Sequence, residues 1–200
     1  MLFNSTAYLI FFPVVVIVYF FIPKISLRNL FLLIASYFFY MCWQPIYIIL
    51  ILVSTISDYF IGLQMEKCSN HNRRKFLLFA SIIINIVILF YFKYFNFLST
   101  SIEEWTGYFG YIVKMPAHHF LLPVGISFYT FQTLSYTIDV YRKQSRAESN
   151  PINFALYVSF FPQLVAGPIE RSTRLLPQFE IKHRFNYLNS TNKCNSLLLS

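Results

Sequence analysis

The chain has 200 residues, of which 56% are hydrophobic, 20% aromatic and only 12% charged. A soluble domain carries about 25% charged residues, so a soluble globular fold is excluded because too little polar surface is present to cover its core. The net charge is +8, but the basic residues lie between apolar runs rather than on one face with exposed aromatic residues. This distribution argues against a nucleic-acid partner and favours cytoplasmic loops beside a lipid bilayer.

Five apolar stretches are each close to the roughly 20 residues that a bilayer crossing requires. In chain order they are residues 6–22, 27–43, 46–64, 76–95 and 120–140. We therefore predict an all-α integral membrane protein with about five transmembrane helices. Lys24 and Arg28 follow the first stretch instead of preceding it, which predicts a retained first helix with its N-terminus outside the cell.

A sixth apolar stretch, residues 152–166, is shorter and is interrupted by Pro162. If this stretch enters the membrane and returns, every Lys and Arg except Lys93 and Lys114 faces the cytoplasm, as the positive-inside rule requires. Broken backbone at membrane depth survives only inside protein or along a watery cavity. We therefore predict a broken or re-entrant helical element packed within the bundle, and a cytoplasmic C-terminus.

Polar groups inside the apolar stretches are functional candidates, because a charge at the bilayer centre costs about 2.5–3.5 kcal/mol. Asp58 either lines a site or bonds a neighbouring helix, and we favour the inter-helix bond. The fifth stretch is the most polar and includes Gln132 and Asp139, so we expect it at the centre of the bundle. Asp139 and Arg142 stand three residues apart, and pairing between them is a better expectation than catalysis.

The residues alone reveal no catalytic constellation. The four histidines lie outside the apolar stretches, and none has a metal-ligand partner at the usual spacing. No Gly-rich phosphate loop and no nucleophile elbow occurs. We predict no metal and no bound cofactor, and we expect any buried site to lie where the polar central helix meets the broken element.

Two long motifs resemble the membrane-bound O-acyltransferase family. They are LPVGISFYTFQTLSYTIDVYR, residues 122–142, and FALYVSFFPQLVAGPIER, residues 154–171. The upstream segments RNLFLLIASYFFYMCWQP, SDYFIGLQME and FKYFNF are also similar to that family. The resemblance is nearest to the alginate O-acetylase branch and covers about residues 1–187, which it identifies as the N-terminal part of such a membrane domain. Residues 188–200 depart from it, and we expect them to form a disordered tail.

The resemblance implies acetyl transfer from a thioester donor, acetyl-CoA or an acyl carrier, to hydroxyls of a cell-surface polysaccharide such as alginate. It also implies periplasmic polysaccharide-acetylation proteins as partners and the bacterial inner membrane as the location. The residues that match the family's central motif, and that are expected to shape its funnel, are Phe161, Pro162, Gln163, Gly167, Pro168 and Arg171. Arg171 would either meet an anionic group of the donor or contact cytoplasmic lipid headgroups.

The resemblance further implies a catalytic histidine that acts as general base on the acceptor hydroxyl. In the family this histidine stands in an apolar stretch well downstream of the second motif, and His183, which lies in a basic segment, does not match it. We therefore assign no catalytic residue and expect the chain to be truncated and inactive on its own. The alternative is a non-catalytic membrane interaction or assembly module. A transporter is disfavoured because the sequence shows no internal repeat.

Overall fold

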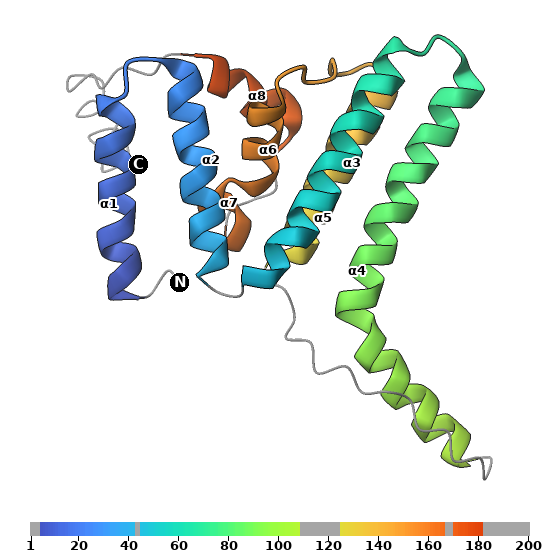
Figure 1. Ribbon diagram of the computed structural model, residues 1–200. Coiled ribbons are helices and arrows are strands. Elements are labelled where there is room, and N and C mark those ends of the chain that lie inside the picture. Colours follow the sequence, from blue (N-terminus) through green and yellow to red (C-terminus); the bar gives the residue numbers. More distant parts are fainter. Residues whose placement is uncertain (1–4, 43–44, 109–124, 167–169, 182–200) are drawn as a thin grey trace, which may run out of the picture.

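The structure is a computed structural model that describes residues 5–42, 45–108, 125–166 and 170–181. The regular secondary structure of this described part is entirely helical, as predicted (Figure 1). The elements are α1 (Thr6–Phe21), α2 (Ile25–Met41), the 3₁₀ turn η1 (Pro45–Tyr47), α3 (Ile48–Lys67), α4 (His71–Tyr108), α5 (Ile126–Tyr141), α6 (Pro151–Ser159), α7 (Phe161–Ala166) and α8 (Ser172–Glu180).

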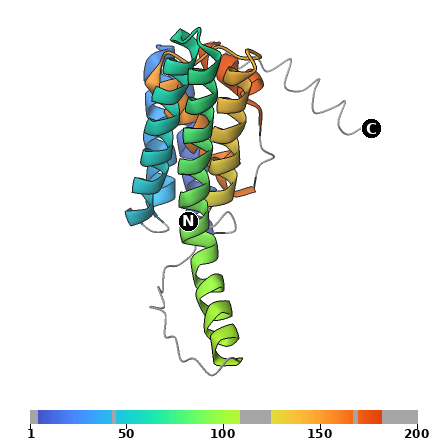
Figure 2. The ribbon, with the colours of Figure 1, turned by 90° about the vertical axis from the view of Figure 1, so that its right-hand side faces the viewer.

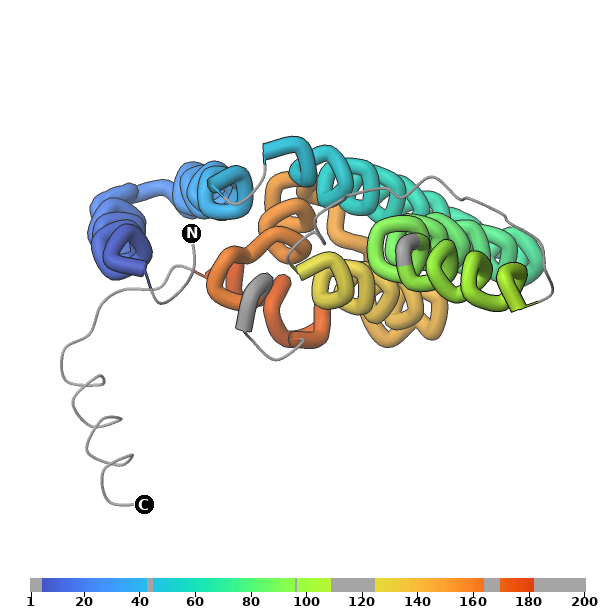
Figure 3. Tube along the Cα trace, turned by 90° about the horizontal axis from the view of Figure 1, so that it is seen from below, coloured from blue at the N-terminus to red at the C-terminus, as the bar shows by residue number. Residues whose placement is uncertain are grey.

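The long helices run side by side between two ends of a bundle, and α5 lies in the middle, packed against α3, α4 and α6 (Figure 3). At one end α2 and α4 begin, and α3 and α5 finish (Figure 1). We call this the basic end, because it carries all the described Lys and Arg residues except Lys93. These residues are Lys24, Arg28, Lys67, Arg73, Arg74, Lys75, Arg142, Lys143, Arg146, Arg171 and Arg174. The clustering matches the charge asymmetry of membrane proteins.

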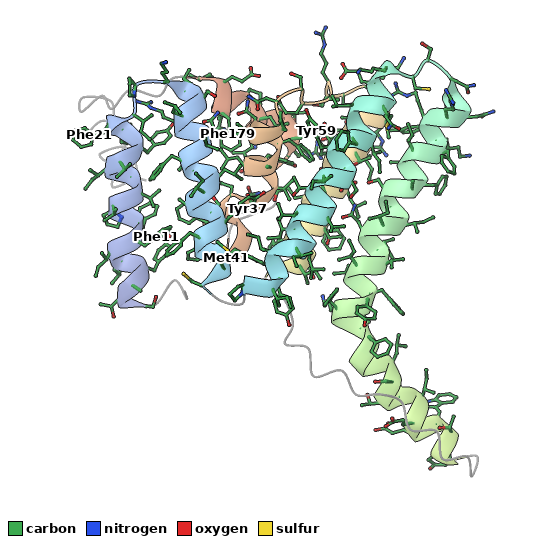
Figure 4. The ribbon with its side chains drawn as sticks, in the orientation of Figure 1. Phe11, Phe21, Tyr37, Met41, Tyr59 and Phe179 are labelled. Carbon is green, nitrogen blue, oxygen red and sulfur yellow. The ribbon has the colours of Figure 1, made fainter. Side chains whose placement is uncertain are left out.

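Within the described residues, two helical stretches are long and apolar enough to cross a bilayer, Pro45–Lys67 with 23 residues and His71–Phe95 with 25. The helices α1 and α2 are apolar but have 16 and 17 residues, and α5 has 16. The number of five crossings therefore stays a prediction. Large apolar side chains cover the outer surface of the bundle, as Phe21 does with 82% of its surface exposed (Figure 4). Such a surface suits hydrocarbon rather than water.

The helix α4 is longer than the apolar pattern predicts. The predicted apolar stretch ends at residue 95, but the helix continues to Tyr108 and projects beyond its neighbours (Figure 2). The side chains of Ser101 and Thr106 donate to the backbone carbonyls of Phe97 and Ile102, each at 2.8 Å. Hydropathy detects a membrane span, whereas this extension is a mixed segment that forms a helix without a continuous apolar run.

The predicted broken element is present as α6 and α7. They are separated at Phe160, whose φ of −57° and ψ of 108° lie outside the helical region. Pro162 stands in the first turn of α7, where the missing N–H disrupts no helical bond. The helix α8 returns to the basic end, where Asn29 Nδ2 at the start of α2 donates to Phe179 O at 2.8 Å (Figure 4). The chain therefore enters and leaves the bundle at the same end.

Candidate functional site

The central helix α5 carries a line of buried polar residues along its length. Gln132, Thr133, Thr137 and Asp139 are all buried, as the polarity of the fifth apolar stretch predicts. Gly125 directly precedes the helix with φ 77°, a left-handed conformation that glycine adopts without steric cost. The polar line therefore begins at a glycine turn and runs toward the basic end.

Asp58 lies fully buried where α3 meets α4 and α5. Its Oδ1 accepts from Ser81 Oγ at 2.6 Å, and its Oδ2 accepts from Asn85 Nδ2 at 2.7 Å. Asn85 Oδ1 in turn accepts from Ser54 Oγ at 2.8 Å and from Thr133 Oγ1 at 3.2 Å. Because these donors come from three helices, the geometry fits the inter-helix interpretation of Asp58 better than a reactive carboxylate.

Gln132 connects α5 to both halves of the broken element. Its Nε2 donates to Tyr157 O at 2.6 Å and lies 3.4 Å from Gln163 Oε1. Tyr157 Oη returns a bond to Gln132 O at 3.2 Å. Carbonyls in the last turn of a helix lack internal partners, so Gln132 satisfies one that the end of α6 leaves open. The structure thus brings together the predicted residues Gln132 and Gln163.

Phe161 fixes the start of α7 against α1 and α2. Its ring lies 5.4 Å from the Phe11 ring and 5.6 Å from the Phe39 ring, and its backbone N–H donates to Ser36 Oγ at 3.3 Å. Phe161 and Pro162 line an apolar groove of about 290 Å³ beside α1. The remaining predicted funnel residues Gly167 and Pro168, and the predicted tail 188–200, lie outside the described residues.

A larger hollow of about 590 Å³ opens at the basic end and brings together three predicted residues, Asp139, Arg142 and Arg171. Both arginines are exposed. The rest of the lining is mixed and consists of Ile82, Phe131, Leu134, Ser135, Ile138 and Gln144. Two guanidinium groups beside an apolar wall can hold an anion that carries an apolar or acyl part.

The last turn of α5 determines where Arg142 lies. Lys143 has φ 60°, and its N–H donates to Val140 O at 3.1 Å. Gln144 N donates to Asp139 O at 2.9 Å. Together with the left-handed conformation of Lys143, these two bonds form a Schellman motif at the end of α5. Arg142 is therefore the C-cap residue that directly follows α5, at the rim of the hollow.

The expected ion pair between Asp139 and Arg142 is not found among the described contacts. Asp139 Oδ2 instead accepts from Ser172 Oγ of α8 at 3.2 Å. A spacing of three residues permits a contact on a helix surface, but the Asp139 carboxylate is buried and turned toward α8 while Arg142 is exposed. The hydrogen bond anchors the start of α8, and Arg171 directly precedes it.

Sequence reasoning missed Arg74, which is buried despite its position in a run of three basic residues. Its guanidinium donates to Met65 O at 3.2 Å, Val140 O at 2.9 Å and Tyr141 O at 2.8 Å. It thereby caps the ends of α3 and α5 together. A signal was available, because Arg74 lies seven and eleven residues before Ser81 and Asn85, on the same face of α4.

The described part of the chain contains one histidine, His71. It is exposed at the start of α4, with its ring 6.2 Å from the Tyr141 ring, and it is not among the residues that line the hollow. Among the described residues, no group of three His, Cys, Asp or Glu side chains is arranged to hold a metal ion. The site therefore consists of a hollow lined by two arginines and a separate buried hydrogen-bond network centred on Asp58.

Comparison with known proteins finds several curated relatives. "Probable alginate O-acetylase AlgI" of Pseudomonas aeruginosa is 39% identical over 180 residues, which is 90% of this chain and 34% of the relative. The protein of the same name in Azotobacter vinelandii is 37% identical over 192 residues, 94% of this chain and 38% of the relative. "Peptidoglycan O-acetyltransferase" of Helicobacter pylori is 31% identical over 222 aligned positions, and the alignment covers 96% of this chain and 41% of the relative.

The chain thus spans 34–41% of the length of these curated relatives. No protein-family model matches the chain, and no solved structure matches it. The similarity covers nearly the whole of this chain, so it includes the central helix, the broken element and the hollow described above.

Proposed function

Since the chain belongs to the membrane-bound O-acyltransferase family, in its alginate O-acetylase-like branch, we propose that it forms the N-terminal portion of an enzyme that acetylates hydroxyls of a cell-surface polysaccharide such as alginate. The proposed donor is a thioester, acetyl-CoA or an acyl carrier. The proposed setting is the bacterial inner membrane, with periplasmic polysaccharide-acetylation proteins as partners. The complete activity is a proposal because the relatives are more than twice as long as this chain.

The hollow at the basic end supports a role in holding the donor. Thioester donors of both kinds carry phosphate groups, and guanidinium groups recognise phosphate through paired, charge-assisted hydrogen bonds. Arg142 and Arg171 face one hollow from two different elements, and this pairing is the observation that carries the proposed donor site. Positive-inside orientation would place the basic end in the cytoplasm, where such donors are made.

Asp139 and Ser172 act as positioning residues in this proposal. Their hydrogen bond of 3.2 Å holds the start of α8 against α5, and this contact sets the distance between the two arginines. Both side chains are buried, so the bond is shielded from water. Preorganised donors bind an anion with less loss of conformational entropy than mobile ones.

Binding of acetyl-CoA to the chain in lipid nanodiscs, measured by titration calorimetry, tests the donor site. We expect Arg142→Gln and Arg171→Gln each to weaken binding about tenfold or more, because a hydrogen bond to a charged group contributes about 1.5–3 kcal/mol. Arg146→Gln is the matched control, since Arg146 is an exposed arginine of the same basic end that is not part of the hollow. Equal losses in all three variants, or no loss in any, would refute the site.

The same preparation tests the assignment of no catalytic residue. With acetyl-CoA and an alginate oligosaccharide present, we expect donor binding without acetyl transfer. The reason is that the one described histidine, His71, stands apart from the hollow. Transfer above the rate of protein-free nanodiscs, followed by mass spectrometry of the oligosaccharide, would show that the chain supplies its own general base.

A further inference from the structure

Four buried hydroxyl groups have no hydrogen-bond partner in the described part of the chain. They belong to Tyr40 of α2, Thr55 of α3, and Tyr129 and Thr130 of α5. Each of these residues is at most 6% exposed. A hydroxyl that is buried without a partner is destabilising, and such groups in native proteins call for an explanation.

The unpartnered hydroxyls are confined to the end of the bundle opposite the basic end. Tyr40 is next to the last residue of α2, and Tyr129 and Thr130 lie in the first turns of α5. Thr55 is seven residues into α3, about 10 Å along that helix at 1.5 Å per residue. Tyr40 and Tyr129 belong to the same buried core cluster.

Comparable hydroxyls nearer the basic end all have partners. Thr133 Oγ1 donates to Asn85 Oδ1 at 3.2 Å, and Thr137 Oγ1 donates to Thr133 O at 2.9 Å. Tyr136 Oη accepts from Glu148 N at 3.0 Å, and Tyr157 Oη donates to Gln132 O at 3.2 Å. The absence of partners is therefore a property of one region rather than of buried hydroxyls throughout this bundle.

The two threonines also lack a hydrogen bond that is available to them within their own helices. A Ser or Thr hydroxyl in a helix can bond the carbonyl four residues before it, as Ser36, Ser57 and Ser159 do with Leu32, Val53 and Ala155 at 2.7–2.8 Å. Thr55 and Thr130 make no such bond. Their hydroxyl groups are free to bond something other than their own helices.

We propose that Tyr40, Thr55, Tyr129 and Thr130 form a binding site for a hydroxylic ligand, water or a carbohydrate hydroxyl, in the half of the bundle opposite the basic end. A hydroxyl group both donates and accepts and carries no charge, so four of them match a neutral hydroxylic ligand better than an ion. The carbohydrate case rests on the proposed acetyl transfer, whereas the water case does not. Gln132 lies one turn further along α5 from Tyr129, so the site adjoins the contact with the broken element.

Hydroxyl-radical footprinting of the chain in lipid nanodiscs tests the site. Radicals form from water at the protein, so a buried side chain that contacts bound water is oxidised although bulk solvent does not reach it. We expect oxidation of Tyr40 and Tyr129 and none of Tyr136 and Tyr157, which are as fully buried as Tyr129 but already hydrogen-bonded. Equal protection of all four tyrosines would overturn the proposal.

Two further footprinting measurements identify the ligand and test whether the tyrosines share one site. An added alginate oligosaccharide that protects Tyr129 would assign the site to carbohydrate, and unchanged oxidation would assign it to water. In Tyr129→Phe we expect oxidation of Tyr40 to fall, while in Tyr136→Phe it stays at the level of the unmodified chain; unchanged oxidation of Tyr40 in both variants would contradict a shared site. None of these readouts requires acetyl transfer, so a failure of the proposed activity would be seen separately.

Discussion

Glu148 lies in the loop between α5 and α6, outside the apolar helices, and it is partly buried. Burial raises the pKa of its carboxyl group, and the nearby charge of Glu180 adds to this effect. An Asn150 N–H that donates to Oε1 at 2.8 Å opposes it. Because the pKa is higher in the folded state, Glu148 contributes stability below its unfolded pKa of about 4.3, and this contribution is lost as the pH rises through the folded value.

We therefore predict that Glu148→Gln raises the free energy of unfolding at pH 7 and reduces its decline between about pH 4.3 and pH 7. Glutamine keeps the acceptor for Asn150 N–H and cannot ionise. Thermal unfolding in detergent across this pH range measures the effect, with the exposed Glu104→Gln as control. A decline as steep in Glu148→Gln as in the unmodified chain would show that burial of this carboxyl group has no energetic consequence.

Arg74 illustrates a cation that works by hydrogen bonding to backbone rather than to a carboxylate. It donates to three carbonyls at the ends of α3 and α5. We predict that Arg74→Gln lowers the free energy of unfolding by about 3 kcal/mol, since bonds to charged groups contribute about 1.5–3 kcal/mol each and glutamine retains part of them. The exposed neighbour Arg73→Gln should change it by less than about 0.5 kcal/mol. Similar losses in both variants would contradict the capping role.

At the scale of helices, α3 and α5 approach closely because Gly62 has no side chain. A Cβ at Gly62 would lie 2.8 Å from Tyr136 Oη, whereas a Cβ at Gly107, near the end of α4, would meet nothing within 4 Å. Tyr136 is fully buried, and its Oη accepts a hydrogen bond from Glu148 N. The phenol therefore cannot move without losing that bond. Small residues at such crossings are typical of helix packing in membranes.

We accordingly predict opposite signs for the same substitution at these two glycines. Gly62→Ala should lower the free energy of unfolding by about 1–3 kcal/mol through overpacking. Gly107→Ala should raise it by roughly 0.5–1 kcal/mol, because alanine has the higher helix propensity. Unfolding midpoints of both variants in one detergent provide the measurement, and stabilisation by Gly62→Ala would contradict the close approach of α3 and α5.

The sequence predicted those features of the fold that depend on neighbouring residues in the chain. The polarity around Gln132 and Thr137 placed α5 at the centre, and Pro162 together with the charge count predicted a break that the structure has at Phe160. The extension of α4 was missed because hydropathy reports membrane spans and not every helix. The partners of Asp139 and Arg74 were missed because they come from elements that are distant in sequence, Ser172 and Val140.

The molecule as a whole has an apolar outer surface and a core in which buried polar residues stand among apolar ones. Phe21, Phe76 and Trp105 expose more than 70% of their surface, while Asp58 and Ser81 are fully buried. This is the arrangement that hydrocarbon as solvent favours, since helices there associate through packing and hydrogen bonds. The backbone break lies at Phe160, whose side chain is partly buried and packs against the core.

The return of α8 to the basic end is the claim on which the proposed donor site most depends, and cysteine labelling tests it directly. Cys42, Cys68 and Cys194 are replaced by serine, and single cysteines are introduced as Arg146→Cys, Glu180→Cys or Tyr108→Cys. A membrane-impermeant maleimide is then applied to sealed vesicles of each orientation. We predict that Arg146→Cys and Glu180→Cys react from one side and Tyr108→Cys from the other. Reaction of Glu180→Cys from the same side as Tyr108→Cys would mean that α6 and α7 cross the membrane, and it would contradict a donor site shared by α5 and α8.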